Sequence, residues 1–222
     1  QTEAQRPEPC GVQNAGFDGC LILNRPTSWG QFTCCARLAN QGYRMSKLIY
    51  YVAASMDGYI ATQDHELDWL TNFILGDDAT PYDDFYQSIG AVIMGGKTYS
   101  WIMENAHGDW PYQDIPAFIL TSQDLAIPQG TGISKVCGNA NDIARHAKLA
   151  AKGKDVWVVG GGKSAAFFAD AGELDQLHIT TIPVFLGEGI KILPVNRNVV
   201  VTPVTNRFLQ SGALESVLTI RK

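Results

Sequence analysis

The sequence contains few of the residues that build metal centres, membrane spans or nucleic-acid surfaces. Only four histidines occur in 222 residues, and no apolar run approaches the roughly 20 residues of a membrane-spanning helix. Acidic side chains outnumber basic ones, with a net charge of -5 and no basic stripe, which disfavours nucleic-acid binding. We therefore expect a soluble, cytoplasmic protein that binds a small molecule and contacts neither membrane nor nucleic acid.

Cysteine is scarce outside the N-terminal region, where its spacing matches no zinc-binding template. Four of the five cysteines fall within the first 35 residues, namely Cys10, Cys20, Cys34 and Cys35. The remaining one is Cys137. Together with the few histidines, this pattern predicts that the protein holds no metal.

Residues 1–44 differ in composition from the rest of the chain. They contain proline, glycine, asparagine and glutamine throughout, without sustained hydrophobic periodicity and without the order of regions that marks a signal peptide. A regular strand pattern begins just after Met45. We interpret residues 45–222 as the folded domain and residues 1–44 as an extension, either a poorly ordered or non-native leader or an element that docks on the domain.

From Met45 onward, apolar runs of strand length alternate with helix patterns. The expected strands are 48–54, 91–94, 116–120, 156–159, 177–183, 198–205 and 215–221. The expected helices are 82–88, 97–103, 141–152 with Asn141 or Asp142 as its cap, and one that begins near Ser164 and ends at Gly172. This alternation is typical of an α/β fold with a mainly parallel sheet covered by helices, and the last two strands indicate an antiparallel edge.

A triple glycine stands between a buried strand and a helix. The strand pattern of residues 156–159 is followed by Gly160, Gly161 and Gly162, and Ser164 opens the helix. Glycines let a backbone approach a ligand closely, and the N–H groups of a first helical turn point at a bound anion. A tight turn without any ligand uses glycine in the same way, so this stretch alone leaves both interpretations open.

Two nucleotide-binding motifs can be compared with this turn. A Walker A loop requires glycine five positions before the Gly-Lys pair, and this chain has Trp157 there, which argues against a P-loop NTPase. The spacing of Gly160, Gly162 and Ala165 fits the looser dinucleotide pattern. A complete doubly wound domain usually begins with that pattern, whereas only a short stretch of chain follows it here.

A second glycine turn occupies an equivalent place. Gly95 and Gly96, followed by Lys97 and Thr98, come directly after the strand 91–94 and open the next helix. Two anion-binding turns at the carboxyl ends of strands in one sheet suit a dinucleotide that carries a pyrophosphate and a further phosphate.

Four sequence blocks together resemble the dihydrofolate reductase superfamily, above all the bacterial branch that shares the reductase domain of the bifunctional riboflavin-biosynthesis deaminase-reductase. They occur in the family's order between about residues 46 and 222. The blocks are AASMDGYIA at 53–61, VIMGGKTY at 92–99, VVGGG at 158–162, and LDQLHITTIP at 174–183 with LGEG at 186–189. The resemblance implies a mixed sheet of about eight strands with helices on both faces, NADPH as the hydride donor, and a homodimer.

The resemblance also implies which residues bind the cofactor. The residues that match the nicotinamide border are Ala53, Ala54, Asp57, Gly58 and Ile60. Those that match the 2′-phosphate side are Gly95, Gly96, Lys97 and Thr98, and those that match the adenosine ribose are Thr121, Ser122 and Gln123. The pyrophosphate cradle is matched by Gly160, Gly161, Gly162, Lys163 and Ser164, and Val159 just before them completes the cofactor-binding set.

One cofactor position departs from the family's pattern. The second turn usually contains an arginine that pairs with the 2′-phosphate, and this chain has Gly96 there. A bidentate phosphate partner is therefore missing. Lys97 and Lys163 are the available substitutes as point charges, and on this basis we expect NADPH in preference to NADH.

The substrate side departs from the family as well. True dihydrofolate reductases carry a pterin-binding carboxylate five residues after a tryptophan, and counting from Trp69 gives Ile74. Asp83 or Asp84 is then the candidate replacement, although either acid also fits the solvated start of a helix. This difference argues against dihydrofolate as the physiological substrate.

These features favour an NADPH-dependent reductase that transfers a hydride to a C=N or C=O carbon of a small heterocyclic or ribosylaminopyrimidine-type substrate, as in 5-amino-6-(5-phosphoribosylamino)uracil reductases. Two alternatives stay open: a genuine dihydrofolate reductase with a relocated carboxylate, and a non-catalytic dinucleotide-binding protein. The candidate catalytic residues are Asp57, Asp84 and Thr180, with water as another proton source. The candidate substrate contacts are Trp69, Asp83, Phe85 and Trp101.

Overall fold

The computed structural model of the protein describes residues 45–106, 109–128 and 130–222. The expectations for residues 1–44 therefore lie outside the described residues. The elements of the described part, in chain order, are β1 (Leu48–Ser55), β2 (Tyr59–Ala61), α1 (Asp68–Thr71), α2 (Tyr82–Gln87), β3 (Ile89–Gly95), α3 (Gly96–Asn105), β4 (Ala117–Leu120), β5 (Ile133–Val136), α4 (Ala140–Ala150), β6 (Asp155–Val159), α5 (Gly162–Asp170), β7 (Gln176–Ile182), β8 (Ile190–Lys191), β9 (Val201–Phe208) and β10 (Leu214–Ile220).

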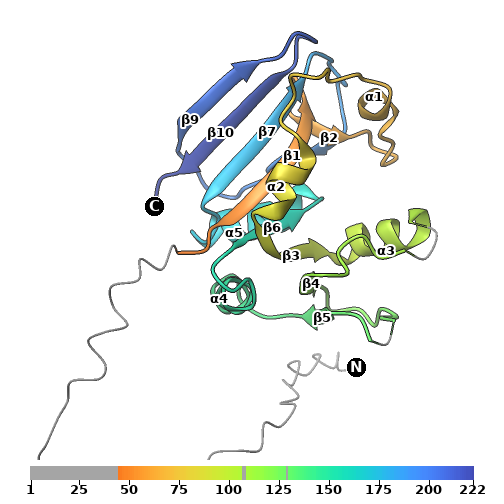
Figure 1. Cartoon of the computed structure of the whole chain (residues 1–222), viewed down its shortest axis with the longest axis vertical. Helices are drawn as coiled ribbons and strands as arrows, with labels where there is room; N and C mark the ends of the chain where they lie inside the picture. The colour runs from red at the N-terminus through yellow and green to blue at the C-terminus, as the bar shows by residue number, and fades with distance from the viewer. Residues whose placement is uncertain (1–44, 107–108, 129) are drawn as a thin grey trace, which may run out of the picture. The chain divides into compact units, whose positions relative to one another are not determined.

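Eight of the strands form one sheet, in the order β5-β4-β3-β6-β1-β7-β10-β9 (Figure 1). The strands from β5 to β7 in this order run parallel, whereas β10 runs antiparallel to both β7 and β9. The predicted α/β class, the mostly parallel sheet and the antiparallel edge are thereby confirmed. Because parallel strands end at the same edge of a sheet, the segments that follow β1, β3, β4, β6 and β7 gather at that edge.

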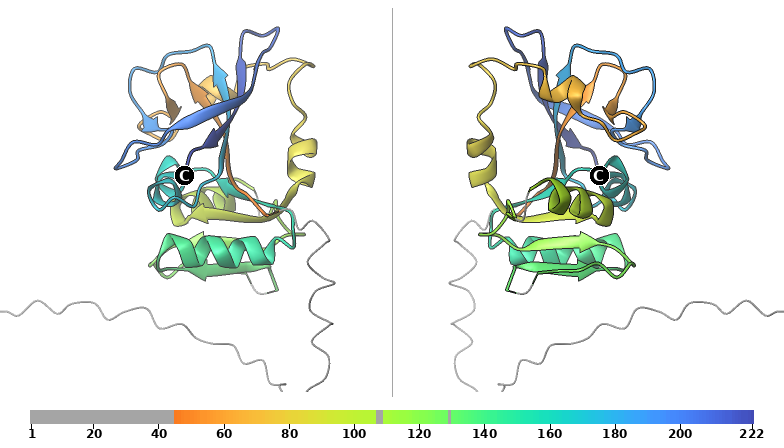
Figure 2. Two further views of the ribbon diagram at one scale, coloured as in Figure 1. Left: turned by 90° about the vertical axis from the view of Figure 1, so that its left-hand side faces the viewer. Right: turned by 90° about the vertical axis from the view of Figure 1, so that its right-hand side faces the viewer.

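Helices cover both faces of the sheet. Successive residues of a strand point to opposite sides, so each strand supplies side chains that pack against the helices of both faces. On one face, buried side chains such as Tyr50 and Val158 pack against α4 and α5. On the other face, Ile49 and Val92 pack against α2 and α3. Figure 2 shows helices on both sides of the strands. Burial of each aliphatic side chain in the two packed clusters, such as Ile49, Val92 or Val158, contributes about 1.5–3 kcal/mol, so these two clusters hold the strand ends in place. Among the described helices, none has the length and apolar character required to cross a bilayer.

Three details of the predicted elements are wrong. The strand expected at 198–205 lies three residues further along the chain, as β9. The short strand β5 escapes the sequence pattern because its two central residues, Ser134 and Lys135, are exposed and polar. The helix α4 is capped by Asn139 in place of the expected Asn141 or Asp142. The Asn139 side chain accepts a hydrogen bond from the Asp142 N–H at 2.9 Å, which satisfies one of the free donors at the helix start.

Candidate functional site

The two glycine turns lie against each other at the ends of the neighbouring strands β3 and β6. The backbone at Gly160 has a φ of +71°, and a Cβ atom placed there would lie 2.6 Å from Thr98 Cγ2. In the other turn, a Cβ atom on Gly95 would lie 2.9 Å from Ser164 Oγ. Glycine at both positions therefore allows the two turns to approach closely enough to contact one ligand.

Each turn leads directly into a helix that has no side-chain cap. The helix α3 begins at Gly96 and α5 at Gly162, and in neither does the capping residue accept a hydrogen bond through its side chain. The first N–H groups of a helix carry partial positive charge and bind anions. The two helices start from adjacent strands but lie on opposite faces of the sheet, so their starts mark a topological switch point, where open α/β sheets bind ligands.

Two lysines bring positive charge to the same turns. Lys97 and Lys163 are each the second residue of their helix, and both side chains are exposed. Within the part of the chain that the structure describes, neither lysine forms a hydrogen bond or an ion pair. Both ammonium groups are therefore available to a bound phosphate.

The segment after β4 approaches the turn that contains Gly96. A Cβ atom on Gly96 would lie 3.2 Å from Thr121 Oγ1, and this oxygen accepts a hydrogen bond from the Gln123 N–H at 3.0 Å. Ser122, between them, is exposed. The fold thus brings together the predicted phosphate and ribose contacts from three separate segments, 95–98, 121–123 and 160–164.

The carboxyl-terminal half of β1 separates from β6. Pairing between the two strands covers Leu48 to Tyr50, whereas the pairing of β1 with β7 continues to Ser55. In the described structure, Ala53 and Ala54 therefore have a strand partner on the β7 side alone. The last pair of this register joins Tyr50 to Val158, two residues before Gly160, so β1 runs on past the strand end at which the glycine turn begins.

Asp57 joins the end of β1 to the loop that follows β7. Its carboxylate accepts hydrogen bonds from Ser55 Oγ at 2.6 Å, from the Gly187 N–H at 2.7 Å and from the Leu186 N–H at 3.1 Å. The Ser55 hydroxyl, followed by these backbone N–H groups, holds the pKa of Asp57 below its ordinary value. An ionised carboxylate that already accepts several hydrogen bonds is a poor proton source, which argues against the predicted donor role of Asp57.

Two further predicted nicotinamide contacts lie in the turn after β1. Gly58 has a φ of +83°, a conformation that favours glycine, and Ile60 is half-buried in β2. The Gly58 carbonyl accepts a hydrogen bond from the Ile192 N–H at 2.9 Å. This turn is therefore fixed to the short β2–β8 sheet.

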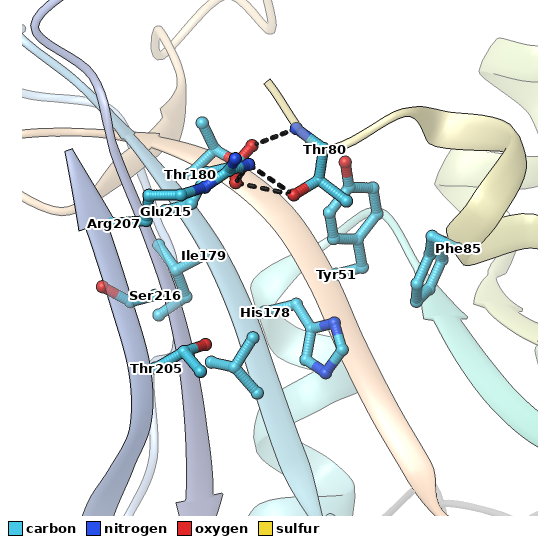
Figure 3. A pocket seen from close by; sticks show the side chains of 11 residues that line it. Tyr51, Thr80, Phe85, His178, Ile179, Thr180, Thr205, Arg207, Glu215 and Ser216 are labelled. Carbon is cyan, nitrogen blue, oxygen red and sulfur yellow. Dashed lines mark hydrogen bonds and ion pairs between the residues drawn. The ribbon is translucent and has the colours of Figure 1, made fainter. Parts of the chain in front are cut away.

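A cavity of about 250 Å³ opens on the sheet face that carries α2 (Figure 3). Its floor is formed by residues that lie directly opposite one another on neighbouring strands and so point to the same face. The first row of opposed residues runs across β7, β10 and β9 as Thr180, Glu215 and Arg207, and Ala53 of β1, which stands opposite Thr180, lies just outside the lining. The second row runs in the same order as Tyr51, His178, Val217 and Thr205.

Aromatic rings form the wall of this cavity. The centroid of the Phe85 ring, on α2, lies 4.3 Å from that of Tyr51 and 5.8 Å from that of His178. Trp157 of β6 packs edge-on against Tyr51 at a centroid distance of 6.1 Å. Burial, together with the charge of Lys47, lowers the pKa of His178, so its imidazole is neutral at pH 7.

An ion pair lies at the upper end of the cavity, beside Thr180 (Figure 3). Glu215 pairs with Arg207 and accepts hydrogen bonds from the Thr80 N–H at 2.8 Å and from the Thr80 hydroxyl at 2.7 Å. Burial alone would raise the pKa of Glu215, but the hydrogen bonds from Arg207 and Thr80 outweigh it and lower the pKa. The carboxylate is therefore ionised, and its charge is compensated by the guanidinium.

The predicted substrate and catalytic residues are not all brought together. Phe85 and Thr180 line the cavity. The five that do not line it are Asp57, Trp69, Asp83, Asp84 and Trp101. Asp83 and Asp84 are exposed in the first turn of α2, where a negative charge stabilises a helix start. Trp69 packs, like Ala53, against the cluster formed by Ile182, Leu209 and Ala213, and Trp101 is 47% exposed on α3.

Sequence reasoning missed the other side chains that face this cavity. They are Tyr51, Thr80, His178, Thr205, Arg207, Glu215 and Val217, whereas the neighbouring Ile179 and Ser216 border the cavity from strand positions whose side chains point to the opposite face. Polar residues that alternate with apolar ones along β7 and β10 are the signal that a polar face exists. That signal does not say which residues stand opposite one another, because this depends on the register of the strands.

Comparisons with known proteins agree with this fold. The family model described as "RibD C-terminal domain" matches residues 46–218. The protein "Uncharacterized protein YwjB" of Bacillus subtilis is 33% identical over 146 residues, which cover 66% of this chain and 82% of that protein.

Two solved structures are similar over most of the described chain. A putative riboflavin biosynthesis protein from Shewanella sp. PV-4 has a TM-score of 0.68 at 24% identity, covering 79% of this chain and 99% of its own. Dihydrofolate reductase from Enterococcus faecalis, complexed with NADP(H), has a TM-score of 0.52 at 15% identity, covering 80% and 98%. The dihydrofolate-reductase-like fold expected from the sequence is thereby confirmed.

Proposed function

The chain belongs to the RibD C-terminal domain family, and from this membership we propose that it is an NADPH-dependent reductase of the riboflavin-pathway type. Its hydride acceptor is a small heterocyclic or ribosylaminopyrimidine-type molecule. One observation carries the proposal: two glycine turns, each opening an uncapped helix, meet at the topological switch point of the sheet.

The glycine turns fit the phosphate groups of a dinucleotide. A side chain at Gly160 or Gly95 would fill the space between the turns, whereas glycine leaves the backbone N–H groups accessible. The N–H groups at the starts of α3 and α5 are suited to the pyrophosphate. Lys97 and Lys163 supply positive charge for the 2′-phosphate, since Gly96 replaces the family's arginine. When bound, the nicotinamide supplies the hydride.

The end of β1 and the neighbouring cavity are suited to the two reacting molecules. Ala53 is half-buried and small enough for a nicotinamide ring to approach, whereas Ala54 is 2% exposed and contributes backbone alone, and Asp57 fixes the loop beside them. The acceptor molecule occupies the cavity next to Ala53, where the rings of Tyr51 and Phe85 contact its face and exclude water.

A specific observation favours dihydrofolate as a second candidate substrate. Glu215 places an ionised carboxylate in the cavity, on the residue directly opposite Thr180. The sequence pattern lacks the usual pterin-binding carboxylate, and Glu215 supplies one from a different strand. Asp83 and Asp84, the replacements suggested by sequence, lie outside the cavity lining.

Turnover of NADPH tests the proposal. The purified protein is mixed with NADPH and either 5-amino-6-(5-phosphoribosylamino)uracil or dihydrofolate, and NADPH oxidation is followed by absorbance. We expect oxidation that depends on one of the two acceptors. Oxidation with dihydrofolate alone would favour the second candidate, and NADPH binding without oxidation would leave a non-catalytic dinucleotide-binding protein.

A further inference from the structure

Tyr51 presents a free hydroxyl group to the cavity. Within the described residues, the hydroxyl forms no hydrogen bond, and the side chain lines the cavity floor. Figure 3 shows the hydroxyl directed along the cavity toward Thr80, and not into the sheet. An unpaired phenol facing a ligand cavity is available as a hydrogen-bond donor to a bound molecule.

Tyr51 lies on β1, the strand that also carries the proposed nicotinamide contacts. Tyr51 lies two residues before Ala53 on β1, so both side chains point to the same face and are separated by about 7 Å along the strand. Ala53 stands opposite Thr180 and Tyr51 opposite His178. An acceptor molecule bound over these four residues has Ala53 at one end. It is long enough to reach the Tyr51 hydroxyl as well.

The ring of Tyr51 is held on two sides. Phe85 packs against it at a centroid distance of 4.3 Å with an interplanar angle of 31°, and His178 stands perpendicular to it at 6.4 Å. The Tyr51 carbonyl also accepts a hydrogen bond from Trp157 Nε1 at 3.3 Å. These contacts restrict the direction of the hydroxyl before any ligand binds, which is the preorganisation that proton transfer requires.

The other ionisable groups near Tyr51 are poor proton donors at neutral pH. The groups that face it are His178 on β7, Glu215 on β10, Arg207 on β9 and Tyr82 on α2. His178 is neutral, Glu215 is an ionised acceptor, and Arg207 is paired with it. Tyr82 is 46% exposed and does not line the cavity.

We propose that Tyr51 is a catalytic residue, which donates its hydroxyl proton to the nitrogen or oxygen of the acceptor as the hydride reaches the neighbouring carbon. The inference rests on the proposed reductase function. The C–H bond forms with the hydride electrons, the π-electrons of the C=N or C=O bond take the proton from Tyr51, and the resulting phenolate regains a proton from water through the open cavity. Neither Asp57 nor Asp84 takes part in this step.

The electrostatic surroundings keep Tyr51 protonated between turnovers. Burial, and after it the negative charge of Glu215, raises the pKa of Tyr51 above its ordinary value. The hydroxyl is therefore fully protonated across the neutral range. Titration of Tyr51 consequently causes no change in the turnover rate of the unaltered protein between pH 6 and pH 9.

The test compares Tyr51→Phe with Tyr86→Phe. The first variant keeps the ring that packs on Phe85 and removes only the hydroxyl, whereas Tyr86 lies on α2 outside the cavity lining. NADPH oxidation is measured from pH 6 to pH 9 with whichever of 5-amino-6-(5-phosphoribosylamino)uracil and dihydrofolate the unaltered protein reduces. NADPH binding and the thermal midpoint are measured in parallel.

For Tyr51→Phe we expect kcat to fall about 100-fold or more, with KM and NADPH binding nearly unchanged. In this variant the acceptor takes its proton from solvent, so kcat should fall about tenfold for each unit of rising pH. The kcat of the unaltered protein and of Tyr86→Phe should not change with pH. A merely structural tyrosine would lower kcat equally at every pH, and that result would overturn the proposal. If the unaltered protein binds NADPH but reduces neither acceptor, the reductase function itself fails and the donor role fails with it.

Discussion

At the scale of single residues, Gly160 shows how the proposed cofactor cradle depends on the absence of a side chain. Its φ of +71° and the 2.6 Å that would separate an added Cβ atom from Thr98 Cγ2 impose two separate restrictions. The first restriction is a backbone conformation that L-residues rarely adopt, and the second is the space between the two turns. The two restrictions can be separated by mutation.

We expect Gly160→Ala to lower NADPH affinity at least tenfold and to destabilise the fold by about 1–3 kcal/mol. The added methyl group must push Thr98 out of the turn that starts α3. Calorimetric titration with NADPH and urea unfolding measure the two effects. Gly153→Ala is the matched control, because Gly153 has a φ of +87° but nothing within 4 Å of its Cβ position. Unaltered affinity in Gly160→Ala would contradict the assignment of this turn.

The glycine turns could be predicted from sequence, whereas the cavity could not. A run of glycines between a buried strand and a helix is a local signal, and two such runs occur within the chain at Gly95 and Gly160. Tyr51 and Glu215 lie far apart in the chain and meet through the pairing of β1 with β7 and of β7 with β10. A shift of one residue in either register would turn one of them to the opposite face.

At the scale of elements, Asp175 links the amino-terminal ends of β1 and β7. It precedes β7 and accepts hydrogen bonds from the Leu48 N–H at 2.8 Å and from Lys148 Nζ at 2.9 Å, and it pairs with Lys222 at 2.6 Å. Burial alone would raise the pKa of Asp175, but the hydrogen bonds from Lys222, Leu48 and Lys148 together lower it. One carboxylate thus links β1, α4 and the end of the chain to β7.

The lowered pKa of Asp175 makes part of the stability depend on pH. A group with a lower pKa in the folded state stabilises the fold above its unfolded pKa of about 3.9, and this contribution is lost as the pH falls through the folded pKa. We therefore expect Asp175→Asn to destabilise the fold by about 1–3 kcal/mol at pH 7 and by clearly less near pH 2.5. Urea unfolding at both pH values measures the difference. Asp124→Asn, at a side chain that is 99% exposed, is the control and should change stability little. An equal loss at both pH values would contradict the account.

The elements themselves were predictable where apolar runs are long. The strands β1, β3 and β6 are buried on both faces, so their apolar runs are visible in the sequence. The edge strand β5 is not visible as an apolar run, because Ser134 and Lys135 face solvent. The cap of α4 lies at Asn139, two residues before the expected position, because several neighbouring polar residues fit a helix start equally well.

At the scale of the whole molecule, the parallel strands and the antiparallel edge supply different halves of the site. The carboxyl ends of β3 and β6 carry the glycine turns, and the faces of β7, β10 and β9 carry the cavity. The strand β1 connects them, since it pairs with β6 through Tyr50 and with β7 as far as Ser55. A cofactor on one side of β1 and an acceptor on the other would therefore meet at Ala53.

Calorimetric titration of the unaltered protein with NADPH, and separately with NADH, tests the central claim most directly. We expect NADPH to bind in the micromolar range and NADH at least tenfold more weakly, because Lys97 and Lys163 carry unpaired positive charge beside the two helix starts. Equal binding of both would show that these lysines do not contact the 2′-phosphate. Binding of neither would contradict the reductase account and leave two glycine turns that serve only the fold.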